Sequence, residues 1–195
     1  MVIFGTKENP LVLASASPRR KEICQMLGWE IEIEPAMAEE PWDETVTKEE
    51  AVLKIAKGKA CEVFKKHPSR VVLGSDTVVL APTGDVLGKP KDEQEAFSML
   101  STLSGKTHRV LTAVWVCTPE KQDGFVSSAL VTFRPLSEQE IKDYIASGEP
   151  MDKAGAYGIQ GIGKCFIANL EGDFYTVMGL PKEELLKFVK SLYFF

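Results

Sequence analysis

The chain has 195 residues, of which 44% are hydrophobic and 26% charged, and its formal net charge is −5 at pH 7. This length suits one buried core, or one core with two lobes, and the acidic balance argues against a broad nucleic-acid-binding surface. No apolar run approaches the ~20 residues of a bilayer-spanning helix, and the N-terminus lacks a signal-peptide pattern, so we expect a cytoplasmic protein that binds no membrane.

The first motif along the chain is a short apolar strand that leads directly into a helix. Residues 12–13 predict a buried strand, Ser17 is a favourable N-cap, and Pro18 suits the first helical position. Arg19 and Arg20 follow in the first turn, where unpaired backbone N–H groups attract anions. The segment predicts a phosphate site, although a capped helix with two solvated arginines would have the same sequence.

Strand and helix patterns alternate along the rest of the chain. Strands are expected at residues 30–34, 71–73, 78–80, 107–117, 125–134 and 165–168. Helices are expected to begin at Thr47, Asp92, Ser137 and Pro181, the first three with capping boxes. Because a hairpin at 82–84 interrupts simple strand–helix–strand winding, we predict an α/β fold with a mixed sheet, in a single domain of residues 1–195. The irregular stretch 149–163 indicates a functional loop or a long connection.

Asp76 is the leading catalytic candidate. It lies in Gly74-Ser-Asp-Thr77, where we expect the apolar strand to break, and a carboxylate there can hold Mg²⁺ or take a proton from water. Lys89, after the hairpin, is expected to meet Asp76 across the same sheet edge. Lys59 lies between a glycine and an alanine of a predicted helix, where the backbone can approach a neighbour closely. The structural alternatives are a turn-capping aspartate and two solvated lysines.

Two loops supply further candidates. Glu39 and Glu40 stand in an acidic run that could provide a metal ligand or be solvated. Gln160 is flanked by glycine-rich sequence, and its carboxamide offers both a donor and an acceptor, as the imide edge of uracil or thymine requires. A loop glutamine bonded to backbone is the alternative. The four cysteines and two histidines lack zinc-site spacing, so the cysteines are expected to be reduced thiols.

These motifs occur together in one order, and in that combination the chain resembles the Maf, or septum formation, family of nucleoside triphosphate pyrophosphatases. The segments that carry the likeness are Leu11–Arg20, Lys59–Ala60, Gly74–Thr77, Gly88–Pro90, Leu103–His108, Gly148–Gly161 and Gly172–Pro181. The resemblance implies an elongated mixed β-sheet flanked by helices, two lobes with a central cleft, a fold like that of inosine triphosphate pyrophosphatases, and commonly a homodimer. The implied reaction is hydrolysis of a nucleoside triphosphate to monophosphate and pyrophosphate with a divalent metal, Mg²⁺ or Mn²⁺.

The resemblance also implies roles for individual residues. Asp76 would be the general base or a metal-linked carboxylate. Phosphates would be held by Arg20, Lys59 and Lys89. Substrate choice would be set by Arg19, Thr77 and Gln160, and the Tyr157–Gly161 loop resembles the subgroup that acts on dTTP and UTP. Where the family often has Asp-Glu, this chain has Glu39-Glu40, which leaves Glu40 as the implied metal ligand. The competing hypothesis is a non-catalytic nucleotide-binding regulator of cell division.

Overall fold

The computed structural model describes residues 4–37 and 41–193, and the chain divides into two compact units. Unit 1 comprises the described residues of 1–76, 112–127 and 179–195, and unit 2 comprises residues 77–111 and 128–178. The single domain expected for residues 1–195 stays a prediction.

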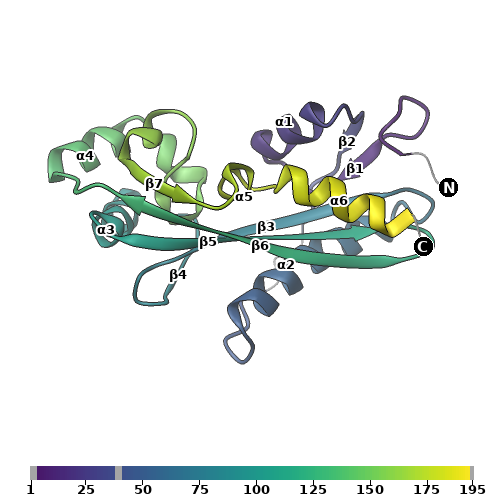
Figure 1. Ribbon diagram of the computed structural model, residues 1–195, viewed down its shortest axis with the longest axis horizontal. Coiled ribbons are helices and arrows are strands. Elements are labelled where there is room, and N and C mark those ends of the chain that lie inside the picture. Colours follow the sequence, from purple (N-terminus) through teal and green to yellow (C-terminus); the bar gives the residue numbers. More distant parts are fainter. Residues whose placement is uncertain (1–3, 38–40, 194–195) are drawn as a thin grey trace. The chain divides into compact units, whose positions relative to one another are not determined.

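The elements alternate along the chain in a mixed α/β order (Figure 1). The strands are β1 (Leu11–Leu13), β2 (Ile31–Ile33), β3 (Val72–Leu80), β4 (Val86–Leu87), β5 (Thr107–Cys117), β6 (Gln122–Phe133) and β7 (Ile167–Glu171). The α-helices are α1 (Pro18–Met26), α2 (Lys48–Phe64), α3 (Glu93–Leu103), α4 (Glu138–Ala146), α5 (Phe174–Met178) and α6 (Lys182–Tyr193). Three short 3-10 helices, η1 (Glu149–Asp152), η2 (Ala154–Ala156) and η3 (Ile162–Phe166), occupy most of the irregular stretch.

The strands form a seven-stranded sheet in the order β2-β1-β3-β5-β6-β7, with β4 paired to β3. β1 is parallel to β2 and to β3, whereas β3 with β4 and β6 with β7 are antiparallel. The predicted α/β class with a mixed sheet and flanking helices is therefore confirmed. No helix in the described ranges is both long and apolar enough to cross a bilayer.

Two strand predictions were wrong. β3 continues from Val72 to Leu80 with no break at Gly74–Thr77, because Gly74 keeps an ordinary φ and makes room for a packed helix instead of a turn. β7 begins at Ile167 and not at Cys165, because Cys165 and Phe166 belong to the preceding 3-10 helix. A glycine in an apolar segment can indicate close packing of a neighbouring backbone as well as a turn.

In unit 1, α2 covers one side of the strands, while α1 and α6 lie on the other (Figure 1). Thr47 and Glu50 form the predicted capping box of α2. A buried cluster joins this helix to the strands through Val12, Ala14, Ala60, Val63, Val72 and Cys117. On the other side, Phe188 of α6 packs on Phe125 of β6 with ring centroids 4.9 Å apart.

Unit 2 has its own core, in which α3 and α4 pack together. Its centre is aromatic: the Phe133 ring lies 4.9 Å from that of His108 and 4.7 Å from that of Tyr157. Tyr144 of α4 extends the cluster to Phe166, at 4.9 Å. These rings anchor the segment that carries Gln160.

Candidate active site

The central feature of unit 1 is an ion pair between Lys59 and Asp76. Nζ of Lys59 lies 2.5 Å from Oδ1 of Asp76, and their side chains are 26% and 17% exposed. The pair is therefore half-buried but open to a ligand, and Asp76 is not a turn cap, because it lies inside β3.

Gly74 explains why these two residues meet. A Cβ on Gly74 would lie 2.6 Å from the carbonyl oxygen of Ala56 and 2.7 Å from the backbone nitrogen of Ala60, so α2 rests directly on β3 at this residue. Asp76 is two residues further along the strand and hence on the same face as Gly74. Lys59, next to Ala60, is thereby brought to the carboxylate.

Arg20 forms hydrogen bonds to other residues of unit 1. Its Nε donates to the carbonyl of Gly179 at 2.9 Å, and its Nη1 donates to Oγ of Ser15 at 3.1 Å. Oγ of Ser75 donates to the same Gly179 carbonyl at 3.1 Å. Burial lowers the pKa of Arg20, and the charge of Asp76 opposes that shift. Arg20 therefore lies within electrostatic reach of Asp76 and also joins α1 to the segment before α6.

The start of α1 has the predicted form, with one difference. Ser17 occupies the N-cap and Pro18 follows it, but the Ser17 side chain does not cap the helix. The backbone N–H of Ser17 instead donates to Oγ of Ser15 at 3.2 Å. Arg19, half-buried, precedes Arg20 in the first turn, so both predicted arginines are at a helix N-terminus.

Thr77, Lys89 and Gln160 belong to unit 2. Thr77 follows Asp76 in β3, and strand alternation places its side chain on the opposite face. Lys89 is exposed, and whether it meets Asp76 as expected stays a prediction. The backbone N–H of Gly155 donates to the carbonyl of Gly88 at 3.0 Å, which joins the Lys89 segment to the segment leading to Gln160.

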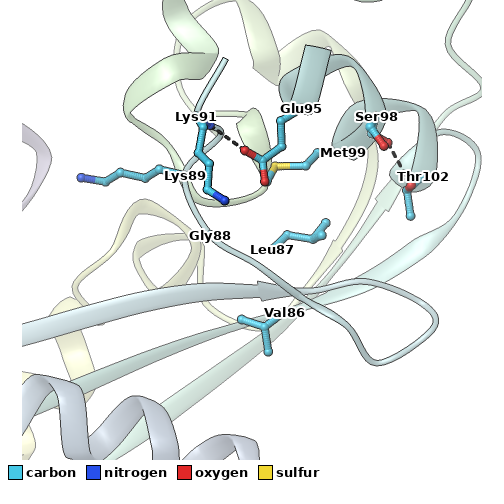
Figure 2. Close-up of a pocket in the computed structure, with 9 residues that line it drawn as sticks. All are labelled: Val86, Leu87, Gly88, Lys89, Lys91, Glu95, Ser98, Met99 and Thr102. Atoms are coloured by element: carbon cyan, nitrogen blue, oxygen red, sulfur yellow. Dashed lines mark hydrogen bonds between the residues drawn. The ribbon is translucent and has the colours of Figure 1, made fainter. Parts of the chain in front are cut away.

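A pocket of about 370 Å³ in unit 2 is lined by residues of β4, α3 and the chain between them. In Figure 2 the Lys89 side chain points away from Met99 and Glu95 of this pocket. The Glu95 carboxylate accepts from the backbone N–H of Lys91 at 2.7 Å, whereas the predicted capping box would have it accept from Asp92. Asp92 does cap α3, because its Oδ1 accepts from the backbone N–H of Glu95 at 2.7 Å.

Gln160 lies half-buried between η2 and η3. Within the described residues its side chain makes no hydrogen bond, so the backbone-bonded alternative is not what the structure has. The turn around it is held by Glu149, which accepts from the backbone N–H of Ile162 at 2.9 Å and of Gly163 at 3.1 Å. A carboxamide at this position is available to a ligand.

The described residues contain no group of three or more potential metal ligands among His, Cys, Asp and Glu. Glu40, the expected metal ligand, lies outside the described residues. Asp76 remains as one half-buried carboxylate, paired with Lys59 and within electrostatic reach of Arg20. This donor set fits a Mg²⁺ or Mn²⁺ ion held mainly by substrate phosphates and water, because Mg²⁺ commonly takes only one or two protein carboxylates.

Several residues that build the site were missed by sequence reasoning. Ser15, Ser75 and the Gly179 carbonyl organise Arg20, and Glu149 with Tyr144 organises the Gln160 turn. All lie in or beside the motifs of the resemblance, except Tyr144.

 Arg20 and Ser75 are separated from Gly179 by 159 and 104 positions of the chain, so only the folded structure reveals these contacts.

Comparison with known proteins agrees with this picture. Residues 10–192 match the family described as Maf-like protein. The chain is 46% identical over 185 residues to the dTTP/UTP pyrophosphatase of Aquifex aeolicus (strain VF5), covering 93% of this chain and 95% of that one. It is also 46% identical over 182 residues to the dTTP/UTP pyrophosphatase of Geobacillus sp. (strain WCH70), covering 93% and 97%.

Among solved structures, the chain is similar to the Staphylococcus aureus Ham1 protein, with a TM-score of 0.47, 12% identity, and coverage of 94% of this chain and 100% of that one. The match over residues 10–192, together with 46% identity across nearly the full length of two relatives, assigns the family. The chain belongs to the Maf family.

Proposed function

We propose that this protein hydrolyses dTTP and UTP to the nucleoside monophosphate and pyrophosphate. The observation that carries the proposal is the half-buried Asp76 carboxylate, held 2.5 Å from Lys59 and within electrostatic reach of Arg20. The names of the relatives from Aquifex aeolicus and Geobacillus support the same activity and the same substrates.

In the proposed mechanism, Asp76 takes a proton from the water that attacks the α-phosphorus. The Lys59 ammonium fixes the orientation of the carboxylate, because the two side chains form an ion pair. Negative charge develops on the pyrophosphate leaving group, and cations placed in advance around it lower the barrier. We assign this role to Arg20, Lys59 and Lys89.

A bound Mg²⁺ or Mn²⁺ ion would be held by Asp76 and by the phosphates, and it would supply additional charge neutralisation at the phosphates. Glu40 is kept as a proposed further ligand. Because the described residues offer no group of three ligands, we expect the ion to bind weakly without nucleotide and tightly with it.

Base selection is assigned to Gln160, with Arg19 and Thr77. The Gln160 carbonyl can accept from N3–H of uracil or thymine while its amide donates to O4. Cytosine presents the reverse order of donor and acceptor at these positions. A site that holds the amide in one orientation therefore rejects cytosine, because buried polar groups would be left unpaired.

The test is pyrophosphate release with Mg²⁺ or Mn²⁺ from dTTP, UTP, CTP, ATP and GTP, with Asp76→Asn as the inactive control. We expect release from dTTP and UTP well above the other nucleotides. Tight nucleotide binding without any release would overturn the proposal and favour a non-catalytic regulator of cell division.

Two further proposals rest on the family resemblance. We place the reaction in the cytoplasm, where nucleoside triphosphates are made and used, and we expect a homodimer. Sedimentation of the purified protein at micromolar concentration tests the second: a species of 21.5 kDa, the mass of one chain, would contradict it.

A further inference from the structure

One carboxylate and one phenol hold both sides of the turn that carries Gln160. Tyr144 donates from its hydroxyl to Oε1 of Glu149 at 3.0 Å and accepts from the backbone N–H of Gly158 at 3.2 Å. The Glu149 carboxylate accepts from the backbone N–H groups of Ile162, at 2.9 Å, and Gly163, at 3.1 Å. The hydrogen-bonded backbone groups thus lie on both sides of Gln160: Gly158 is two residues before it, and Ile162 is two residues after it.

The turn closes so tightly on these groups that two of its positions leave no space for a side chain. A Cβ on Gly161 would lie 2.7 Å from Oε2 of Glu149, and Gly161 has a φ of +71°. A Cβ on Gly163 would lie 2.7 Å from the Tyr144 hydroxyl and 2.7 Å from the Gly158 carbonyl oxygen. The backbone on both sides of Gln160 is therefore in direct contact with its anchors.

The anchors themselves are held in the core of unit 2. Tyr144 is 2% exposed and packs edge-on against Phe166. Burial, and then the charge of Glu149, raise the pKa of Tyr144, so its hydroxyl stays a donor at neutral pH. Desolvation is the largest influence on the pKa of Glu149 and raises it, but the hydrogen bonds from Ile162, Gly163 and Tyr144 and the charge of Lys153 together outweigh it, so the net pKa is lowered. An ionised carboxylate accepts hydrogen bonds only, as this arrangement requires.

We propose that Glu149 and Tyr144 are positioning residues for base selection, which fix the Gly158–Gly163 turn and so restrict the edge that Gln160 presents to a pyrimidine. The proposal rests on the proposed function and deepens it. One orientation of the carboxamide matches uracil and the rotated orientation matches cytosine. Gln160 therefore discriminates between the two bases only if its surroundings restrict that rotation. A turn released from its anchors would let Gln160 adopt either orientation.

The test compares Glu149→Gln with Glu138→Gln, a matched change at a carboxylate in the first turn of α4 that is 81% exposed. In Glu149→Gln, one of the two backbone N–H groups faces an amide NH₂ group instead of an acceptor. We expect hydrogen exchange at the Ile162 and Gly163 amides to become at least about tenfold faster. The ratio of kcat/KM for UTP to that for CTP should fall about tenfold, whereas Glu138→Gln should change neither.

Tyr144→Phe provides a second variant, because it removes the hydroxyl with little change in shape. It should accelerate exchange at Gly158 and lower the UTP to CTP ratio in the same direction. Exchange at Val131, which is fully buried in β6, reports whether the core of unit 2 remains intact in each variant. Faster exchange in the turn with an unchanged ratio would overturn the proposal, and so would an unchanged exchange rate in Glu149→Gln.

Equilibrium binding of UMP and CMP separates this proposal from the proposed function. If the wild-type protein binds UMP more tightly than CMP but releases no pyrophosphate, the proposed hydrolysis is refuted. The positioning role is then tested by the ratio of the dissociation constants for UMP and CMP in Glu149→Gln and Tyr144→Phe. Loss of the UMP preference in both variants would then support the positioning role. Equal wild-type affinity for UMP and CMP, together with equal turnover of UTP and CTP, would overturn it.

Discussion

Lys59 reaches Asp76 because Gly74 lacks a side chain. The ammonium lies 2.5 Å from Oδ1 of the aspartate, while the backbone of α2 occupies the space that a Cβ of Gly74 would need. A local property of one residue in β3 thus determines which cation accompanies the proposed catalytic carboxylate.

Replacement of Asp76 by Asn should abolish turnover and preserve the fold, because the change is nearly isosteric. Loss of a catalytic base typically lowers the rate by ~10²–10⁴. Lys59 is 26% exposed and can be solvated when its partner is neutral, so we expect only a small change in thermal midpoint. Pyrophosphate release and a melting curve check both parts, and near wild-type release would refute the role of Asp76.

Replacement of Gly74 by Ala should disturb both stability and activity. The new methyl would meet the backbone of α2 at Ala56 and Ala60, and overpacking of this kind costs about 1–3 kcal/mol. Movement of α2 would also displace Lys59 and lower kcat. The stability control is Gly88→Ala, since a Cβ there would have no atom within 4 Å. Equal midpoints in urea for the two variants would contradict this interpretation.

Removal of the Arg20 side chain and removal of the Lys89 side chain should have different effects on stability. Arg20→Ala loses the hydrogen bonds to Gly179 and Ser15, so we expect lower stability as well as lower kcat/KM. Lys89→Ala removes an exposed side chain and should lower kcat/KM alone, by the equivalent of about 1.5–3 kcal/mol for one charge-assisted contact. Urea unfolding and steady-state kinetics on both variants provide the measurement. A loss of stability in Lys89→Ala with normal kinetics would make that lysine structural.

Gln160→Ala should narrow the preference for dTTP and UTP, chiefly by slowing hydrolysis of these favoured substrates. Its side chain makes no hydrogen bond within the described part of the chain, so the fold should be unaffected. The measurement is kcat/KM on UTP, dTTP and CTP for wild type and variant. Equal wild-type activity on CTP and UTP would refute the role of Gln160 even if pyrophosphate were released.

His108 should make stability depend on pH. Burial lowers its pKa from 6.5 to about 4, so between these values the unfolded chain binds a proton that the folded protein excludes. The contribution of His108 to the free energy of unfolding is fully present above pH 6.5. It is lost as the pH falls toward 4, by about 1.4 kcal/mol per pH unit between these two values. Urea unfolding between pH 5 and 6.5 should show this slope in wild type but not in His108→Gln. The same slope in His108→Gln would assign it to another group.

Most strands and helices, the mixed α/β class and the residues that could carry chemistry could be predicted from the sequence. The capping boxes at Thr47 and Ser137 were confirmed, because the side chains and backbone groups of a cap lie within four residues of each other. Helix starts, hairpins and apolar periodicity are local properties, and local sequence is sufficient to indicate them.

The folded structure determines how those residues are used. It kept β3 continuous through Gly74, paired Asp76 with Lys59, and gave two of the Arg20 hydrogen bonds to Gly179 and Ser15. It also placed Glu149 at the centre of the Gln160 turn. Each of these outcomes depends on which backbones pack closely enough to touch. That packing depends on contacts between segments distant in the chain, and the spacing of residues within one motif does not predict such contacts.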